Sequence, residues 1–152
     1  MKKITPYLWF DNMQAEVAMN FYVSLFKNSK VNSISRGPDG NVFHVLFELD
    51  GQEFMGLNAG EMFKFNEAIS MYVNCEDQEE VDYFWSKLSA VPESEQCGWC
   101  KDKFGLSWQI IPKQLMELME DPDPEKAGRV SDAIMEMKKI VVADLEKAYN
   151  GK

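Results

Sequence analysis

The chain has 152 residues, of which 45% are hydrophobic and 12% aromatic, values typical of a folded domain rather than of a disordered chain. Sixteen basic and twenty-five acidic residues give a formal net charge of −9, and a surface of that sign repels nucleic acid phosphates and anionic lipids. We therefore expect no nucleic acid and no membrane among the partners of this protein.

The N-terminal apolar run, Ile4 to Phe10, is too short to cross a membrane, and no small-residue cleavage site follows it. The three cysteines, Cys75, Cys97 and Cys100, are an odd number, which favours a reducing compartment. We therefore expect a cytoplasmic protein. Cys97 and Cys100 form a CxxC motif, but the residues that follow predict a turn, and no second CxxC or histidine cluster completes a zinc site. We interpret these two residues as ordinary strand cysteines.

The chain contains an internal repeat, which begins with a strand and a helix. Residues 4–12 align with residues 69–77, and both are short alternating segments that end in residues suited to helix capping. An amphipathic helix is predicted after each one, and Asp77 and Glu80 have the spacing of a capping box. Apolar residues at helical spacing define the two buried faces, Ala18, Phe21, Tyr22 and Leu25 in the first and Val81, Phe84, Trp85 and Leu88 in the second.

Antiparallel strands follow each helix. Residues 31–35 and 42–49 flank a turn cluster, and Asp50-Gly51 turns the chain into residues 52–58. In the second copy Phe104-Gly105 turns into residues 106–111, so that Met55 aligns with Gln109. A compressed strand over residues 89–95 completes the predicted repeat.

Helices are predicted beyond Pro112. Residues 114–119 form a short one, and Asp123 and Pro124 have the residue types of a helix start, with the helix continuing through Lys138. Its apolar stripe continues towards the C-terminus, and the segment is rich in methionine at Met116, Met119, Met135 and Met137. We expect this stripe to cover one edge of the core or to contact a second chain.

The sequence resembles the vicinal oxygen chelate superfamily, which includes glyoxalase I, bleomycin-resistance proteins and extradiol dioxygenases. More narrowly, it resembles the PhnB-like branch, often labelled 3-demethylubiquinone 3-methyltransferase. The resemblance covers nearly the whole chain. The segments that carry it are residues 4–10, Asn20-Phe21-Tyr22, residues 63–70, Gly98-Trp99, residues 102–110, residues 121–126 and residues 137–140.

The resemblance implies an α+β fold with two tandem strand-helix-strand-strand-strand modules that form a curved mixed sheet around a cavity, followed by C-terminal helices. We expect a single domain, 1–152, with module 1 at about 1–60, module 2 at about 67–112 and a C-terminal helical extension at 113–152. The resemblance also implies a homodimer. The methyltransferase label disagrees with the residues, because the glycines are scattered over turns and no glycine-rich cofactor turn is present.

Metal-dependent members of the superfamily take His and Glu ligands from four strand positions, which the repeat places at about Thr5, Met55, Ser70 and Gln109. None of these is a His, Asp or Glu, so we expect no metal and no cofactor. No Ser-His-Asp or Cys-His arrangement can be assembled around the one histidine, His44.

Strand alternation divides the residues between a cavity side and a helix side. If Thr5 and Ser70 face the cavity, Ser107 does too, while the helix side is almost wholly apolar. Rings with a few polar groups are typical of a small-molecule pocket, whose mouth we expect Trp99 and Phe65 to close. The predicted ligand-binding residues are Tyr7, Trp9, His44, Tyr72, Asn74, Trp99 and Gln109.

The sequence therefore predicts a glyoxalase- or bleomycin-resistance-like protein that binds a small, partly aromatic or cationic molecule without a catalytic metal. One alternative is a lyase, isomerase or dioxygenase-like enzyme with a metal held by His44, Glu48 and Gln109. Another is an interaction protein that uses its methionine-rich C-terminal helices.

Overall fold

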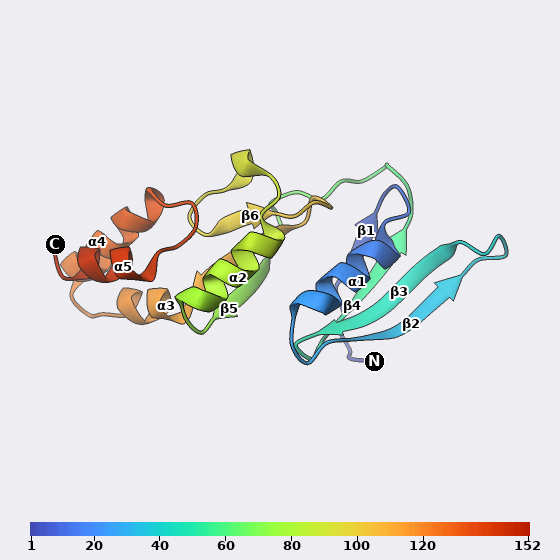
Figure 1. Ribbon diagram of the computed structural model, residues 1–152, viewed down its shortest axis with the longest axis horizontal. Helices are drawn as coiled ribbons and strands as arrows, with labels where there is room; N and C mark the ends of the chain where they lie inside the picture. Colours follow the sequence, from blue (N-terminus) through green and yellow to red (C-terminus); the bar gives the residue numbers. More distant parts are fainter. The chain divides into compact units, whose positions relative to one another are not determined.

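A computed structural model describes all residues, 1–152, and divides the chain into two compact units, Met1–Phe65 and Asn66–Lys152 (Figure 1). Each unit has one mixed β-sheet and at least one α-helix, so the predicted α+β class is confirmed. No helix is both long enough and apolar enough to span a membrane.

The first unit is a four-stranded sheet with one helix. Its strand order is β1-β4-β3-β2, in which β1 is parallel to β4 and the other pairs are antiparallel. The predicted turn at Asp50-Gly51 is confirmed, with φ of 48° and 78°, the left-handed values that a two-residue hairpin loop requires. The elements are β1 (Tyr7–Phe10), α1 (Ala15–Leu25), β2 (Lys30–Arg36), β3 (Val42–Leu49) and β4 (Gln52–Asn58).

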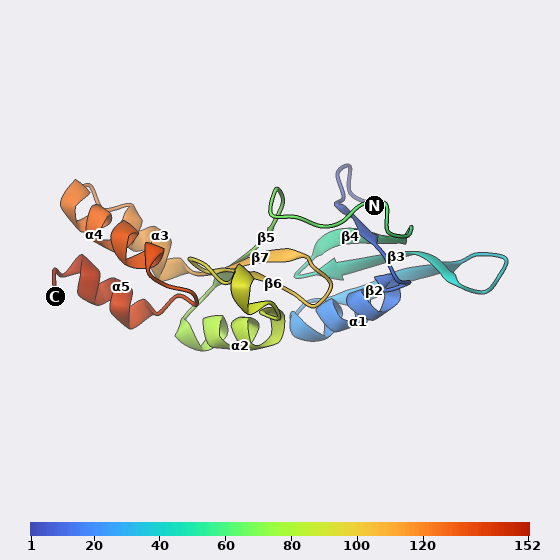
Figure 2. The ribbon, with the colours of Figure 1, turned by 90° about the horizontal axis from the view of Figure 1, so that it is seen from above.

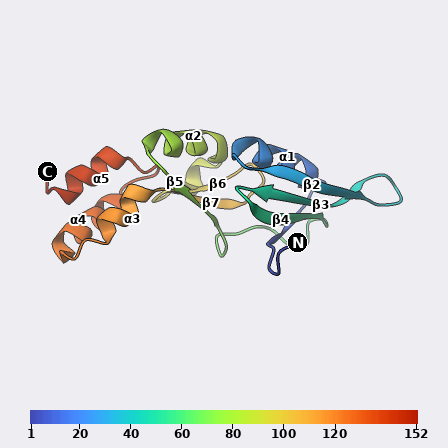
Figure 3. The same ribbon diagram turned by 90° about the horizontal axis from the view of Figure 1, so that it is seen from below.

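Helix α1 packs on one face of this sheet, as Figures 2 and 3 show. Its predicted stripe is largely confirmed, because Ala18, Tyr22 and Leu25 are buried and Phe21 is half-buried. The Tyr22 ring lies 6.4 Å from the ring of Phe47 on β3. The apolar face of the helix therefore forms the core of this unit with the sheet.

The second unit contains a three-stranded sheet of order β5-β7-β6, again with one parallel pair. The strand predicted over residues 89–95 is wrong, because a 3₁₀ turn at Pro92–Ser94 takes its place. Pro92 lacks a backbone N–H and has a fixed φ, which suits the start of such a turn better than a paired strand. The elements are β5 (Met71–Cys75), α2 (Gln78–Leu88), β6 (Trp99–Lys101) and β7 (Ser107–Pro112).

The internal repeat is confirmed at the level of strand register. Tyr7 pairs with Met55 in the first sheet, and Tyr72 pairs with Gln109 in the second. Each parallel pair joins the first strand of its unit to the last one. The predicted cap is also present, since the Asp77 carboxylate accepts a hydrogen bond from the Glu80 N–H at 2.9 Å.

A buried carboxylate holds the turn before β7. Asp102 is 1% exposed, and it accepts hydrogen bonds from the backbone N–H groups of Phe104 and Leu106 and from the Trp108 indole, at 2.8, 3.1 and 2.8 Å. The predicted turn is therefore fixed by side-chain hydrogen bonds, which also anchor the largest ring of β7.

Three C-terminal helices follow β7: α3 (Lys113–Met119), α4 (Pro124–Met135) and α5 (Val142–Tyr149). The predicted start of α4 is confirmed by the Asp123 cap, but the helix ends at Met135 and not at Lys138. These helices form a small core with Ile111 of β7. Met116, Met119 and Met135 are exposed, while Met137 packs against this core.

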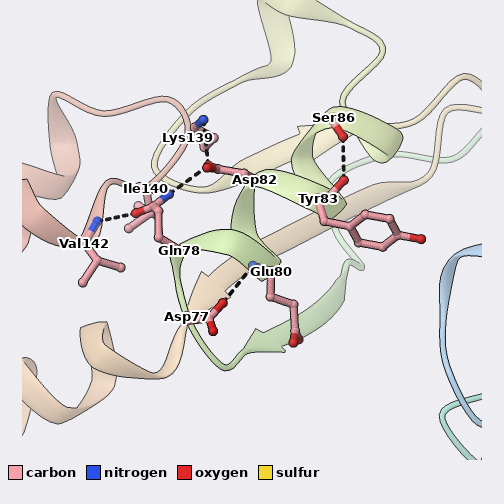
Figure 4. A network of polar contacts seen from close by, with 9 residues as sticks. All are labelled: Asp77, Gln78, Glu80, Asp82, Tyr83, Ser86, Lys139, Ile140 and Val142. Atoms are coloured by element: carbon pink, nitrogen blue, oxygen red, sulfur yellow. Dashed lines mark hydrogen bonds and ion pairs between the residues drawn. The ribbon is translucent and has the colours of Figure 1, made fainter.

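Gln78 fastens the segment before α5 to the start of α2 (Figure 4). Its amide donates to the Ile140 carbonyl at 3.0 Å and accepts from the Val142 N–H at 2.7 Å. An ion pair between Lys139 and Asp82, at 2.8 Å, lies beside it. The Gln78 side chain therefore provides hydrogen-bond partners for two backbone groups at the start of α5.

Candidate functional site

Each sheet has one face covered by its helix and an opposite face that we call the open face. Strand alternation places Leu8 and Phe10 of β1 in the core, and leaves Tyr7 49% exposed on the open face of the first sheet. On β5, Val73 is buried and Tyr72 is 50% exposed. The predicted division of these strands is thus confirmed in both units.

A line of hydrogen bonds crosses the open face of the first sheet. The His44 Nε2 atom lies 2.8 Å from Ser35 Oγ on β2, and its Nδ1 atom lies 3.4 Å from the Tyr7 hydroxyl on β1. A neutral imidazole donates at one nitrogen and accepts at the other, so it can transmit a change of proton position between these two hydroxyls. The sequence did not single out Ser35, which pairs with His44 beyond a register shift in the β2-β3 hairpin.

Trp9 is half-buried, and its polar group is already used. Its indole N–H donates to the Gly60 carbonyl at 2.8 Å, and its ring lies edge-on to Phe63 at 4.9 Å. Phe65 packs against the core ring of Phe10 at 5.4 Å. Trp9 therefore offers ring surface rather than a donor, and Phe65 packs beside the core, while its place at a cavity mouth stays a prediction.

Three predicted residues lie side by side on the open face of the second sheet. Tyr72 of β5 pairs with Gln109 of β7, which pairs with Trp99 of β6. The Gln109 amide donates to Ser70 Oγ at 2.9 Å, which fixes its orientation. Partial burial raises the pKa of the Tyr72 phenol, so this group remains a donor at neutral pH. Asn74, also predicted, is exposed two residues further along β5.

Each unit contains a hollow. One, of about 370 Å³ in the second unit, is lined by Trp99 together with Ser107 and Glu67. The other, of about 440 Å³ in the first unit, is lined by residues such as Met13 and Phe43 and contains no predicted site residue. Ser107 was expected on the open face as a polar cavity residue, but it is 1% exposed and its hydroxyl has no hydrogen-bond partner.

The residues at the superfamily's metal positions do not fit a divalent ion. Ser70 and Gln109 are hydrogen-bonded to each other, Met55 offers only a thioether, and the Thr5 hydroxyl is buried without a partner. No three His, Cys, Asp or Glu residues lie together. Hard cations prefer carboxylate oxygens and transition-metal ions also take imidazole nitrogens, and this set has neither donor.

The alternative metal site does not assemble either. His44 and Glu48 share a face of β3, but four residues along a strand correspond to roughly 13 Å. Glu48 pairs with Lys30 at 3.3 Å, and hydrogen bonds from Asn32 and Lys30 lower its pKa. The third donor of that alternative, the Gln109 amide, is hydrogen-bonded to Ser70.

The CxxC motif separates into two different environments. Cys100 lies on β6 with 2% exposure, and burial raises its pKa to about 12, as burial also does for Cys75. Cys97 is instead the first residue of a two-residue hairpin loop, with φ of 51°, and its side chain is half-buried. The interpretation as a strand cysteine is therefore right for Cys100 and wrong for Cys97.

Comparisons with known proteins agree with this architecture. The model of the 3-demethylubiquinone-9 3-methyltransferase family matches residues 2–111, so the three C-terminal helices, and the segment between Asp121 and Ile140, lie outside the matched part. Among curated proteins, none matches the chain.

Several solved structures cover about three quarters of the chain. The PhnB protein of Bacillus cereus is 41% identical over 73% of this chain and 99% of its own, with a TM-score of 0.64. A Staphylococcus aureus protein is 32% identical over 72% of this chain and 94% of its own, with a TM-score of 0.36. A Pseudomonas aeruginosa protein, 13% identical over 74% and 98%, shares the fold with a TM-score of 0.55.

Proposed function

Because this chain belongs to the PhnB-like 3-demethylubiquinone-9 3-methyltransferase family, within the vicinal oxygen chelate superfamily, we propose that it binds a small molecule on its open sheet faces. The observation that carries this proposal is the row Tyr72–Gln109–Trp99, in which two rings flank one oriented amide. Rings supply contact area and the amide fixes the orientation of a ligand, which is the usual composition of a small-molecule site.

The first sheet supports the same proposal with Tyr7, Trp9 and His44, and Asn74 extends the row in the second. The net charge of −9 favours a cationic ligand, and the exposed phenol rings suit one that is partly aromatic. We propose a cytoplasmic homodimer that sequesters such a molecule, with the oligomeric state measured by sedimentation.

The family name by itself does not lead us to propose methyl transfer. The turns from β1 to α1 and from β5 to α2 contain no glycine, whereas the common cofactor-binding methyltransferases wrap a glycine-rich strand-to-helix turn around the cofactor. The proposal therefore assigns binding, and not group transfer, to these residues.

A second candidate function is proton transfer to or from the bound ligand. It is favoured by the Ser35–His44–Tyr7 line, which ends in a half-exposed phenol beside the one imidazole of the chain. A Tyr7 hydroxyl that gives up its proton can be resupplied through His44. Turnover that Tyr7→Phe abolishes while ligand binding persists would distinguish this enzyme from a sequestering protein.

Binding is tested by thermal-shift screening of cationic aromatic compounds, followed by titration calorimetry with the best one. We expect Tyr72→Ala to weaken binding about tenfold, the effect of losing one central aromatic contact. Tyr83→Ala is the matched control, since Tyr83 is 40% exposed on α2, the helix side of the same sheet. Equal losses in both variants, or no binder in the class, would contradict the proposal.

A chelator titration on the same protein, purified without a histidine tag, completes the test. We expect binding to be unchanged by the chelator because the donors at the metal positions do not fit a divalent ion. Metal found in stoichiometric amount by elemental analysis would contradict this expectation.

A further inference from the structure

The cavity of about 370 Å³ in the second unit has an unusual wall. It is lined by an aromatic ring, a carboxylate, an amide, two thiols and two hydroxyls, from Trp99, Glu67, Gln96, Cys97, Cys100, Ser94 and Ser107. Such a volume accommodates a small organic molecule. Only Trp99 of this set belongs to the ligand-binding residues proposed above.

Ser107 offers an unpaired hydrogen-bonding group at the wall of this cavity. Its side chain is 1% exposed, and its hydroxyl has no hydrogen-bond partner within the protein. A buried hydroxyl without a partner destabilises the fold, and such groups in native proteins are usually paired. A polar ligand in the cavity would supply the missing partner.

Cys97 presents a fixed thiol to the same cavity. Both backbone N–H groups of its loop are held by the chain before α5, that of Cys97 by the Met137 carbonyl at 2.8 Å and that of Gly98 by the Lys138 carbonyl at 2.7 Å. The Cys97 sulfur accepts a hydrogen bond from the Gln96 amide at 3.1 Å, and it lies 3.9 Å from the Met135 sulfur. These contacts fix the position of the sulfur at the wall of the cavity.

Cys100 cannot compete for this chemistry. It lines the same cavity, but it is only 2% exposed, and burial raises its pKa to about 12, which keeps the thiol protonated. A resolving cysteine must reach and attack the modified sulfur as a thiolate. A modification of Cys97 would therefore persist and not collapse into a Cys97–Cys100 disulfide.

The geometry points to a mixed-disulfide site: we propose that the cavity binds a small disulfide carrying an ammonium group, and that Cys97 exchanges with it. The Cys97 thiolate attacks one sulfur of the ligand, so that a new S–S bond forms and the old one breaks. The other half of the ligand leaves as a thiolate, and the proton of Cys97 goes to water. The ligand itself is the oxidant, since one of its sulfurs is reduced as Cys97 is oxidised.

Charge selects the ammonium group. The Glu67 carboxylate lines the cavity, and its hydrogen bond from Lys101 at 2.5 Å lowers its pKa, so at neutral pH it is ionised and offsets the charge of this lysine. With the lysine offset, the net charge of −9 of the chain favours a cationic ligand. A cationic disulfide should be attracted and an anionic one repelled.

The test compares cystamine with 3,3′-dithiodipropionic acid by mass spectrometry of the intact, reduced protein. We expect one adduct, on Cys97, formed about tenfold faster with cystamine at low ionic strength. The rate should saturate with cystamine concentration, because binding in the cavity precedes exchange. Cys97→Ser should abolish the adduct, and Cys100→Ser should retain it.

Two further variants separate the cavity from a merely accessible thiol. Ser107→Ala should raise the half-saturating concentration of cystamine, and Glu67→Gln should reduce the preference for cystamine. Glu79→Gln, which removes one charge from α2 outside the cavity, should leave that preference unchanged. A linear rate with both reagents alike, or an adduct on Cys75 or Cys100, would overturn the proposal. Because the readout is the adduct, its failure leaves the proposed function of Tyr72 and Gln109 untouched.

Discussion

Replacing Gly98 by alanine should destabilise the second unit more than any other single methyl group added to a turn. Gly98 has a φ of 84°, where an alanine costs about 1–2 kcal/mol. An added Cβ would lie 2.7 Å from Ile111 Cδ1, 3.1 Å from Ile140 Cγ1 and 3.3 Å from the Ile110 carbonyl oxygen. Overpacking of this kind costs about 1–3 kcal/mol, so the expected total is about 2–5 kcal/mol.

Urea denaturation measures the loss, and hydrogen exchange locates it. We expect faster exchange from Ile140 to Val142, because the Gly98 loop holds the chain beside them. Gly40→Ala is the matched control, with a φ of 81° and no atom within 4 Å of the added Cβ. It isolates the backbone cost of about 1–2 kcal/mol. Equal losses in the two variants would refute the reasoning, because the contacts with the three isoleucines would then cost nothing.

Other substitutions should have effects of either sign. Gly128→Ala, in the interior of α4 with nothing within 4 Å, should raise the free energy of unfolding by about 0.5–1 kcal/mol in urea. Asp102→Asn should lower it by about 2–3 kcal/mol and alter the near-ultraviolet circular dichroism, because an amide cannot accept all three hydrogen bonds. Gln78→Leu should accelerate hydrogen exchange at the start of α5, and unchanged exchange would contradict its role as a fastener. The hydrogen bond from Tyr149 lowers the pKa of Asp121 and raises the pKa of Tyr149 itself. The bond therefore stabilises the fold at pH values between the ordinary pKa of a carboxyl group and that of a phenol. This stabilisation is lost as the pH falls through the pKa of Asp121. Tyr149→Phe should therefore lower the melting temperature at neutral pH and leave it unchanged in acid.

The sequence predicted the repeat and the two faces of each sheet because both depend on local periodicity. The alternation of β1 and β5 placed Tyr7 and Tyr72 on open faces, and the alignment of Met55 with Gln109 agrees with the observed register. These features need only the two-residue period of a strand. The repeat and the two faces of each sheet could therefore be predicted from the sequence alone.

Two features that the sequence did not predict, the partner of His44 and the turn conformation of Cys97, arise where the backbone departs from the regular two-residue period of a strand. The pairing between β2 and β3 shifts register twice, between Val31 and Ser33 and again between Ser35 and Arg36. The cross-strand partner of His44 cannot be counted from the turn through such irregularities. Cys97 was misplaced for a similar reason, because it has the left-handed conformation that turns usually give to glycine or asparagine.

His44 and Glu48 lie on the same face of β3, but they are too far apart to bind one metal ion together. His44 and Glu48 do share a side of β3, as alternation requires, but the rise of a strand separates residues four apart by roughly 13 Å. That separation follows from the sequence once the strand is assigned. Whether Glu48 already has an ion-pair partner in Lys30 required the structure.

The pairing of first with last strand in each unit has a consequence for synthesis on the ribosome. The β2-β3-β4 meander can form from neighbouring hairpins, but β1 has its only partner in β4, about fifty residues later in the chain. The N-terminal strand must therefore remain unpaired until Asn58 has left the exit tunnel, and β5 must wait in the same way for β7. The C-terminal helices, whose small core includes Ile111, can dock only after that second closure. The newly made chain is thus exposed to chaperones and to misassociation in two separate intervals, each ended by the synthesis of a single strand.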